Sequence, residues 1–190
     1  MIPPRVFVIS GPSGGGKTTV MARLRRQFRG LARSVSVTTR ARRAGERDGR
    51  DYRFISPAAF QALRRRRQLL EWATVHGAWY GTPKQPVLQA LARGRSVLLS
   101  IDVQGVRAIR RLLGRRAALI FLLPPSLTQL RERLLRRKTE SPATLRRRLA
   151  AARREMACAS WYDYSVINDR LDRTVRQVSA IIAACQRKGS

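Results

Sequence analysis

An eight-residue glycine-rich pattern near the start of the sequence limits the possible folds more than any other feature. It satisfies G-x-x-x-x-G-K-[ST] and consists of Gly11, Pro12, Ser13, Gly14, Gly15, Gly16, Lys17 and Thr18. It follows an apolar run over 6–9 and opens a helix-compatible segment over 17–28, which is the context the pattern requires. Glycines let backbone N–H groups face a phosphate chain, and the helix N-terminus favours the same anion. Lys17 would reach the β- and γ-phosphates and Thr18 would bind Mg²⁺, so the pattern predicts a nucleoside triphosphate site. A plain glycine-rich turn would not explain the Lys-Thr pair.

The length and the few cysteines predict one ordinary globular unit. A chain of 190 residues fits a single α/β domain with small insertions. No signal-peptide pattern and no apolar run of membrane-spanning length occur, so we expect a cytoplasmic protein without a membrane partner. Cys158 and Cys185 lie far apart in helical patterns and His76 is the only histidine, which predicts neither a disulfide framework nor a Cys/His metal site. The oligomeric state stays open.

The charge of the chain is unusual. The formal net charge is +29, and of the 40 basic residues only four are lysines. Such a balance is typical of nucleic-acid binding, but the arginines are spread over nearly every predicted helix. We therefore interpret most of them as a solvated surface with a bias toward arginine, which also predicts nonspecific, salt-sensitive polyanion binding.

Strand and helix patterns alternate along the chain, which indicates an α/β fold with a parallel sheet. Continuous apolar runs predict buried strands over 97–101 and 118–122, and a last strand is expected over 164–167. Residues 34–38, 51–55 and 70–75 predict a smaller strand-rich insertion, followed by a loop over 77–81 and a helix capped by Thr82-Pro83. Two arginine-rich helices, starting after Ser126 and Ser141, form a predicted helical hairpin.

Several further motifs, in this order, resemble the guanylate kinase family over nearly the whole chain. They are Ser36-Val37-Thr38-Thr39-Arg40, Arg43, residues 45–52, Glu71-Trp72-Ala73, Tyr80-Gly81-Thr82, residues 101–105 and Ile167-Asn168-Asp169. The resemblance implies a P-loop kinase fold with a five-stranded parallel core sheet flanked by helices. It also implies a core over 1–33, 93–125 and 160–190, a GMP-binding region over about 34–92 and a helical lid over about 126–159.

The activity that the resemblance implies is transfer of the ATP γ-phosphoryl group to GMP, giving ADP and GDP, with Mg²⁺. Its GMP-binding residues would be Ser36, Arg40, Arg43, Tyr52, Glu71, Tyr80, Thr82 and Asp102. Carboxylates only accept hydrogen bonds when ionised, so two of them suit the N1–H and N2–H₂ donors that guanine has and adenine lacks. Arginine and tyrosine supply directed donors to phosphate. The plainer alternatives are surface arginines, ordinary strand tyrosines, an outward-facing Glu71 and a helix N-cap at Asp102.

The resemblance also implies how ATP is held and how catalysis works. ATP contacts would come from residues 11–18 together with Thr19 and Asn168. Catalysis would consist of positioning and charge neutralisation by Lys17, Arg40, Arg137 and Arg148, since the attacking phosphate needs no strong base.

Five positions depart from the family pattern. They are Ala41, Ser100, Arg136, Lys138 and Arg170, of which Ser100 stands where an acid is usual near the metal or substrate. Three alternative functions stay open: a kinase for a sugar phosphate such as ribose 1,5-bisphosphate, a non-catalytic guanylate-kinase-like binding module, and a polyanion-binding protein.

Overall fold

A five-stranded parallel sheet forms the centre of the molecule in the computed structural model, which describes residues 3–75, 77–136 and 142–187. Its order is β2-β7-β1-β8-β9. The strands are β1 (Val6–Ser10), β2 (Ala32–Arg33), β7 (Val97–Ser100), β8 (Ala117–Leu123) and β9 (Tyr164–Ile167). All five residues of β1 are buried, as expected for the middle strand of a sheet covered on both faces. The predicted five-stranded core sheet is therefore confirmed.

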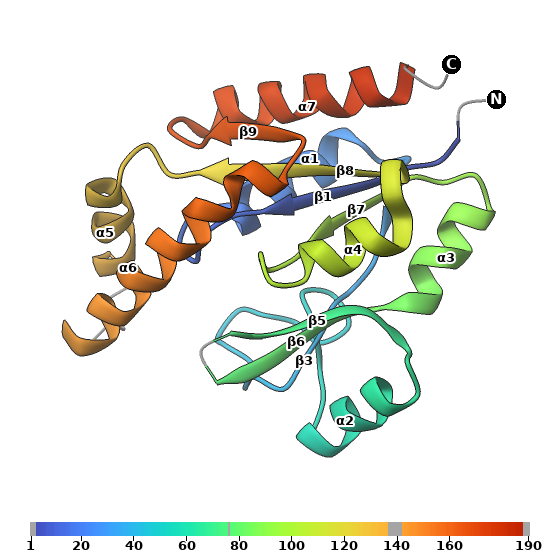
Figure 1. The fold of residues 1–190 in the computed structure, drawn as a ribbon, viewed down its shortest axis with the longest axis horizontal. Helices are drawn as coiled ribbons and strands as arrows, with labels where there is room; N and C mark the ends of the chain where they lie inside the picture. Colours follow the sequence, from blue (N-terminus) through green and yellow to red (C-terminus); the bar gives the residue numbers. More distant parts are fainter. Residues whose placement is uncertain (1–2, 76, 137–141, 188–190) are drawn as a thin grey trace.

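Helices cover both faces of this sheet (Figure 1). They are α1 (Lys17–Gln27) and α7 (Leu171–Arg187) on one face, and α3 (Lys84–Ala92) and α4 (Val106–Leu113) on the other. Successive side chains of a strand point to opposite faces, so Phe7 and Ile9 pack with α1 and α7 while Val6 and Val8 pack with α3 and α4. The two apolar layers fix the carboxyl end of β1, where the glycine-rich loop begins.

A second sheet of four strands lies beside the core, with α2 (Pro57–Arg65) packed on it (Figure 1). Its order is β4-β3-β6-β5, with β3 (Val37–Thr38), β4 (Arg53–Phe54), β5 (Leu69–Val75) and β6 (Ala78–Pro83). The prediction of a loop over 77–81 was wrong, because most of that segment belongs to β6, which pairs with both β3 and β5. Thr82 is accordingly a buried strand residue, and α3 begins after Pro83 without a side-chain cap. The strand predicted over 34–38 is shorter, and the pair before it joins the core sheet as β2.

Two helices, α5 (Leu127–Leu135) and α6 (Pro142–Met156), pack against each other at the opposite end of the molecule from α3 (Figure 1). Their contact buries a small apolar cluster that includes Leu130, Leu134 and Leu145. Ser126 caps α5 by accepting a hydrogen bond from the Gln129 N–H, as its position predicts. Short 3₁₀ turns follow α4 and α6 over Gly114–Arg116 and Ala157–Trp161. Among the helices of the described residues, none combines the length and apolar character needed to cross a bilayer.

Candidate active site

The phosphate loop, residues 11–18, connects the buried end of β1 to the start of α1. Gly14 and Gly16 have φ values of 88° and 87°, a region that costs little only for glycine. Gly16 is also the residue before the first turn of α1, so the free N–H groups of that helix open into the loop. Thr18 and Thr19 lie exposed in this first turn. The loop thus has the conformation that the sequence pattern predicts.

Two side chains hold this loop from opposite ends of the chain. The Asn168 amide, which is buried, donates a hydrogen bond of 2.6 Å to the Gly15 carbonyl, and a Cβ at Gly16 would collide with that amide. The Lys17 ammonium donates to the carbonyl oxygens of Gly11 and Pro12, at 2.5 and 3.0 Å. The positive charge therefore lies over the loop, and Asn168 fixes the loop from the position directly after β9.

A third contact comes from α6. The Ser13 hydroxyl accepts a hydrogen bond of 2.8 Å from Arg148, and the Ser13 N–H donates one of 3.2 Å to the Glu155 carboxylate. Arg148 and Glu155 are two helical turns apart and so share one face of α6. Burial raises the pKa of Glu155, and the charge of Asp102 adds to this, against the attraction of Lys17 and Arg148. One face of α6 thus brings both a cation and a carboxylate to the phosphate loop.

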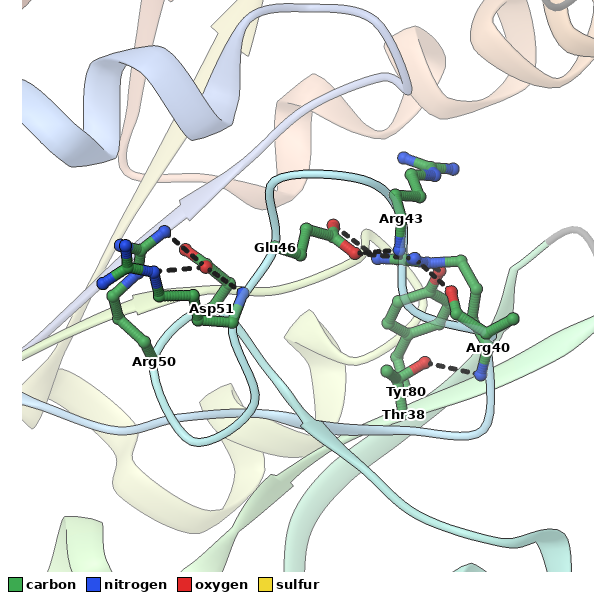
Figure 2. A network of polar contacts seen from close by, with 9 residues as sticks. Thr38, Arg40, Arg43, Glu46, Arg50, Asp51 and Tyr80 are labelled. Atoms are coloured by element: carbon green, nitrogen blue, oxygen red, sulfur yellow. Dashed lines mark hydrogen bonds and ion pairs between the residues drawn. The ribbon is translucent and has the colours of Figure 1, made fainter.

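A second polar group, the Arg40 cluster, consists of Arg40, Arg43, Glu46, Tyr52 and Tyr80. Figure 2 shows all of these residues except Tyr52. Arg40 donates to both Glu46 carboxylate oxygens, at 3.0 and 2.8 Å, and to the Tyr80 hydroxyl at 3.0 Å. Glu46 also accepts the Arg43 N–H, while the Arg43 side chain extends away from this pair in Figure 2. Burial works against ionisation of Glu46, but the hydrogen bonds from Arg40 and Arg43 keep its pKa below the usual value. The ionised Glu46 therefore fixes the orientation of the Arg40 guanidinium through two hydrogen bonds.

The two tyrosines of the Arg40 cluster pack edge to face, with ring centroids 5.8 Å apart. The Arg40 guanidinium carbon lies 5.5 Å from the centroid of the Tyr52 ring. The two rings and the guanidinium are therefore neighbours, although Arg40 comes from a loop, Tyr52 directly precedes β4 and Tyr80 lies on β6.

A buried carboxylate lies on the four-stranded sheet, next to the strand β6 that carries Tyr80. Glu71 on β5 is 6% exposed and accepts a hydrogen bond of 2.5 Å from the Thr82 hydroxyl on β6. Burial raises the pKa of Glu71 to about 7, and the charge of Asp102 adds to this against the Thr82 hydrogen bond. A Cβ at Gly105 would collide with this carboxylate, so the start of α4 approaches Glu71 closely. An acid in such surroundings at a concave site is a candidate for ligand recognition.

The charge of Asp102 raises the pKa of both Glu71 and Glu155, although burial is the larger cause for each. Its carboxylate accepts the Gln104 N–H at 3.0 Å, which stabilises a turn. α4 begins only at Val106, so the alternative that Asp102 caps this helix is wrong. Ser36 is half-buried directly before β3.

Comparison with known proteins gives a consistent result. The family model described as guanylate kinase matches residues 3–185. The chain belongs to the guanylate kinase family. It is 48% identical to the guanylate kinase of Gloeobacter violaceus over 94% of this chain and 86% of that one. The guanylate kinase of Oleidesulfovibrio alaskensis is 46% identical over 97% and 90% of the two chains. The crystal structure of guanylate kinase from Anaplasma phagocytophilum superposes with a TM-score of 0.82 and 32% identity, covering 99% and 89%.

Most of the residues predicted for a guanylate kinase site lie either at the phosphate loop or in the Arg40 cluster. Lys17, Asn168 and Arg148 contact the phosphate loop, and Arg40 and Tyr80 contact each other. Asn168 is hydrogen-bonded to the loop backbone, and its predicted contact with ATP stays a prediction. Arg137 lies outside the described residues.

The departures from the family pattern take plain structural places. Ser100 is half-buried at the carboxyl end of β7, beside Ile9 of β1. Ala41 accepts a hydrogen bond from Arg40 through its backbone carbonyl, which needs no particular side chain. Arg136 ends α5, and the Arg170 N–H donates to Asp169. Lys138 lies outside the described residues.

Sequence reasoning assigned no role to Glu46 or Glu155, although both organise the site. The signal that could have found them is the scarcity of acid, since only 11 carboxylate residues accompany 40 basic ones. In such a chain, an acid inside a matching motif or on an arginine-rich helix has many possible partners. Which partner it contacts depends on the fold.

Proposed function

We propose that this guanylate kinase family member transfers the γ-phosphoryl group of ATP to GMP, with the residues described above in the following roles. The observation that carries the proposal is the buried Glu71 carboxylate beside the Thr82 hydroxyl, on the sheet whose strand β6 also carries Tyr80 of the Arg40 cluster. A base-reading end and a phosphate-reading end thus share one sheet. The phosphate loop of the core supplies the donor side.

Glu71 would accept the N1–H and N2–H₂ groups of guanine, with Asp102 as a second acceptor. Ser36 would donate its hydroxyl group toward O6 of the base, and Thr82 would do the same by turning its hydroxyl away from Glu71. Adenine offers neither N1–H nor N2–H₂, so it would supply no donor to the buried Glu71, and a buried carboxylate that is only partly satisfied costs free energy. This supports GMP over a sugar phosphate, which has no base to satisfy Glu71.

Arg40, Arg43, Tyr52 and Tyr80 would bind the phosphate of GMP. Arg40 is already fixed by Glu46 and Tyr80, so it would lose little conformational entropy when the phosphate arrives. Arg43 is exposed and would turn toward the phosphate from the same loop. The phosphate of GMP is an ionised nucleophile, so its orientation is the main requirement.

Lys17 would leave the two loop carbonyl oxygens for the β- and γ-phosphates of ATP, and residues 11–19 would surround the triphosphate with N–H groups. The residues present suit Mg²⁺, because this ion commonly takes phosphate oxygens, waters and one or two protein oxygens, and the Thr18 hydroxyl is exposed at the helix start. When bound, Mg²⁺ supplies charge neutralisation to the phosphates. Arg148 already lies at the loop, and Arg137 would join it, so that both stabilise the charge of the transferring group.

The experiment that tests the proposal is a coupled assay of ADP release with ATP and Mg²⁺. Acceptors are compared side by side: GMP, AMP, ribose 1,5-bisphosphate and none. We expect turnover with GMP and at least about a hundredfold lower kcat/KM with AMP. Turnover with ribose bisphosphate alone would replace the proposed acceptor. ATP binding without any turnover would indicate a repurposed cleft.

A further inference from the structure

A cavity of about 620 Å³ lies where α2, β5 and the start of α4 meet. Neither the phosphate loop nor the Arg40 cluster lines it. Its volume falls in the range of small-molecule sites. Polar and aromatic side chains line it from the end of α2 and the turn after it, from β5 and from the turn before α4: Arg64, Arg65, Arg67, Trp72 and Gln104. Glu71, the proposed acceptor for guanine, also borders this cavity, but the proposed function gives no role to its arginines or to Trp72.

Trp72 is the aromatic residue that lines the cavity, and Arg64 stacks on its ring. The Arg64 guanidinium carbon lies 3.8 Å from the centroid of the Trp72 ring, a close cation–π contact. The indole is nevertheless 41% exposed, although it is among the largest apolar side chains of the molecule. A stacked guanidinium keeps its N–H groups directed outward, where they can bind an anion. The wall therefore offers both an aromatic surface and hydrogen-bond donors.

The three arginines of the cavity have no carboxylate partner in the described part of the chain. Over residues 3–75, 77–136 and 142–187, no carboxylate forms an ion pair with Arg64, Arg65 or Arg67. Glu71 also lines the cavity, but its hydrogen-bond partner is Thr82. Three guanidinium groups around one space repel each other, and a phosphate chain would relieve this repulsion while accepting several charge-assisted hydrogen bonds.

The backbone at Arg67 is the observation that separates this cavity from the general arginine surface. Arg67 has φ of 53°, and it is the only non-glycine residue with positive φ in the part of the chain that the structure describes. It ends α2 in a Schellman motif, because its N–H donates to the Arg64 carbonyl and the Gln68 N–H donates to the Leu63 carbonyl. Glycine is the residue usually found at this position, since a Cβ is strained there. An arginine at that place costs stability, and its side chain lines the cavity.

We propose that this cavity is a second anion site that binds a nucleoside triphosphate, with the phosphates on Arg65 and Arg67 and the base against Trp72. The residues that line the cavity indicate this class of ligand. Several guanidinium groups without carboxylate partners suit a phosphate chain, and the exposed indole suits a planar base. Because α4 belongs to the core and β5 carries Glu71, a ligand here contacts both parts of the molecule. The proposal does not depend on the kinase activity.

The test is calorimetric titration of GTP into the protein at physiological salt, with ADP and GMP held at saturating concentrations so that the active site is filled. We expect one further binding site. Arg67→Gly is the decisive variant, because it removes the guanidinium and also relieves the backbone strain. It should weaken GTP binding about tenfold while raising the Tm, so a loss of binding cannot be explained by unfolding.

The matched control is Arg93→Gln, which removes the same charge at the end of α3, away from the cavity. It should change GTP affinity less than twofold. Equal weakening by both variants would assign the binding to the overall positive charge and overturn the proposal, as would the absence of any binding to the filled enzyme. Inorganic tripolyphosphate should bind more weakly than GTP, and equal affinity would overturn the nucleoside assignment.

Discussion

The phosphate loop and the Arg40 cluster are both proposed to bind phosphate, but the first presents main-chain groups and the second presents side chains. In the loop, positive φ angles at two glycines set the direction of the N–H groups. In the Arg40 cluster, Glu46 and Tyr80 set the direction of a guanidinium. Main-chain donors recognise any triphosphate and depend on few side chains. Side-chain donors can be tied to a particular acceptor, but they need supporting partners.

The carboxylates also have different roles in the two regions. On the acceptor side, Glu46 orients a cation and Glu71 is placed to read a base. On the donor side, Glu155 occupies an N–H group of the loop itself. We therefore expect acids on the acceptor side to favour substrate binding and Glu155 to oppose it.

Lys17→Ala should have the largest effect, because Lys17 is the one side chain of the loop proposed to bind the transferring phosphoryl group. We expect kcat to fall by about 10³-fold while GMP affinity stays within about twofold. Steady-state kinetics and equilibrium binding of GMP measure the two quantities. Lys84→Ala, at the start of α3, is the control and should be fully active. An active Lys17→Ala enzyme would remove the donor half of the comparison.

Glu71→Gln should stabilise the protein at neutral pH. The folded-state pKa of about 7 lies above the value of 4.5 for a free glutamate, so the folded protein holds a proton that the unfolded chain has released between these pH values. The wild-type protein therefore loses stability as the pH rises from about 4.5 to 7, by about 3 kcal/mol in total. Glutamine avoids this loss. Urea unfolding should show the variant more stable at pH 8 and nearly equal to wild type at pH 5, and a gain independent of pH would contradict the burial argument.

The same variant should lose selectivity. An amide presents one acceptor where the carboxylate presents two, and it lacks the charge that strengthens both hydrogen bonds to guanine. We expect the ratio of kcat/KM for GMP over AMP to fall by about 30-fold, which corresponds to about 2 kcal/mol. Unchanged discrimination would leave base reading to Asp102 and the hydroxyl groups.

The contrast between the two regions also explains how much of the site could be predicted from sequence. The phosphate loop is local, so eight consecutive residues and the flanking strand and helix were enough to predict it. β6 was missed because Tyr80-Gly81-Thr82 followed by proline has the composition of a loop, and only pairing with β3 and β5 makes it a strand. The contact between Ser13 and Glu155 joins residues 142 apart in the sequence. No local sequence pattern predicts such a contact. The positive φ angle of Arg67 could not be predicted from local sequence either.

Glu46→Gln tests whether the side-chain region needs its support. The amide can accept only one of the two Arg40 hydrogen bonds and does not attract the guanidinium, so Arg40 would become mobile before GMP binds. We expect the KM for GMP to rise about tenfold with little change in the KM for ATP. Asp51→Asn is the matched control in the same loop, since Asp51 pairs with Arg50 and not with Arg40 (Figure 2). Equal effects of the two changes would mean that the loop as a whole, and not the Arg40 pair, determines GMP affinity.

Glu155→Gln should have the smallest effect and the opposite sign. Its carboxylate contacts the loop that is proposed to surround the ATP phosphates, so removing the charge reduces repulsion of the incoming anion, while the amide oxygen can still accept the Ser13 N–H. We expect the KM for ATP to fall roughly threefold at pH 8. Because burial raises the pKa of Glu155, the wild-type carboxyl itself becomes neutral as the pH falls, and the difference between the two proteins should shrink. Glu132→Gln, an exposed change on α5, should alter nothing. A higher KM for ATP in Glu155→Gln would reverse the assignment and make Glu155 a support for the donor site, as Glu46 is for the acceptor site.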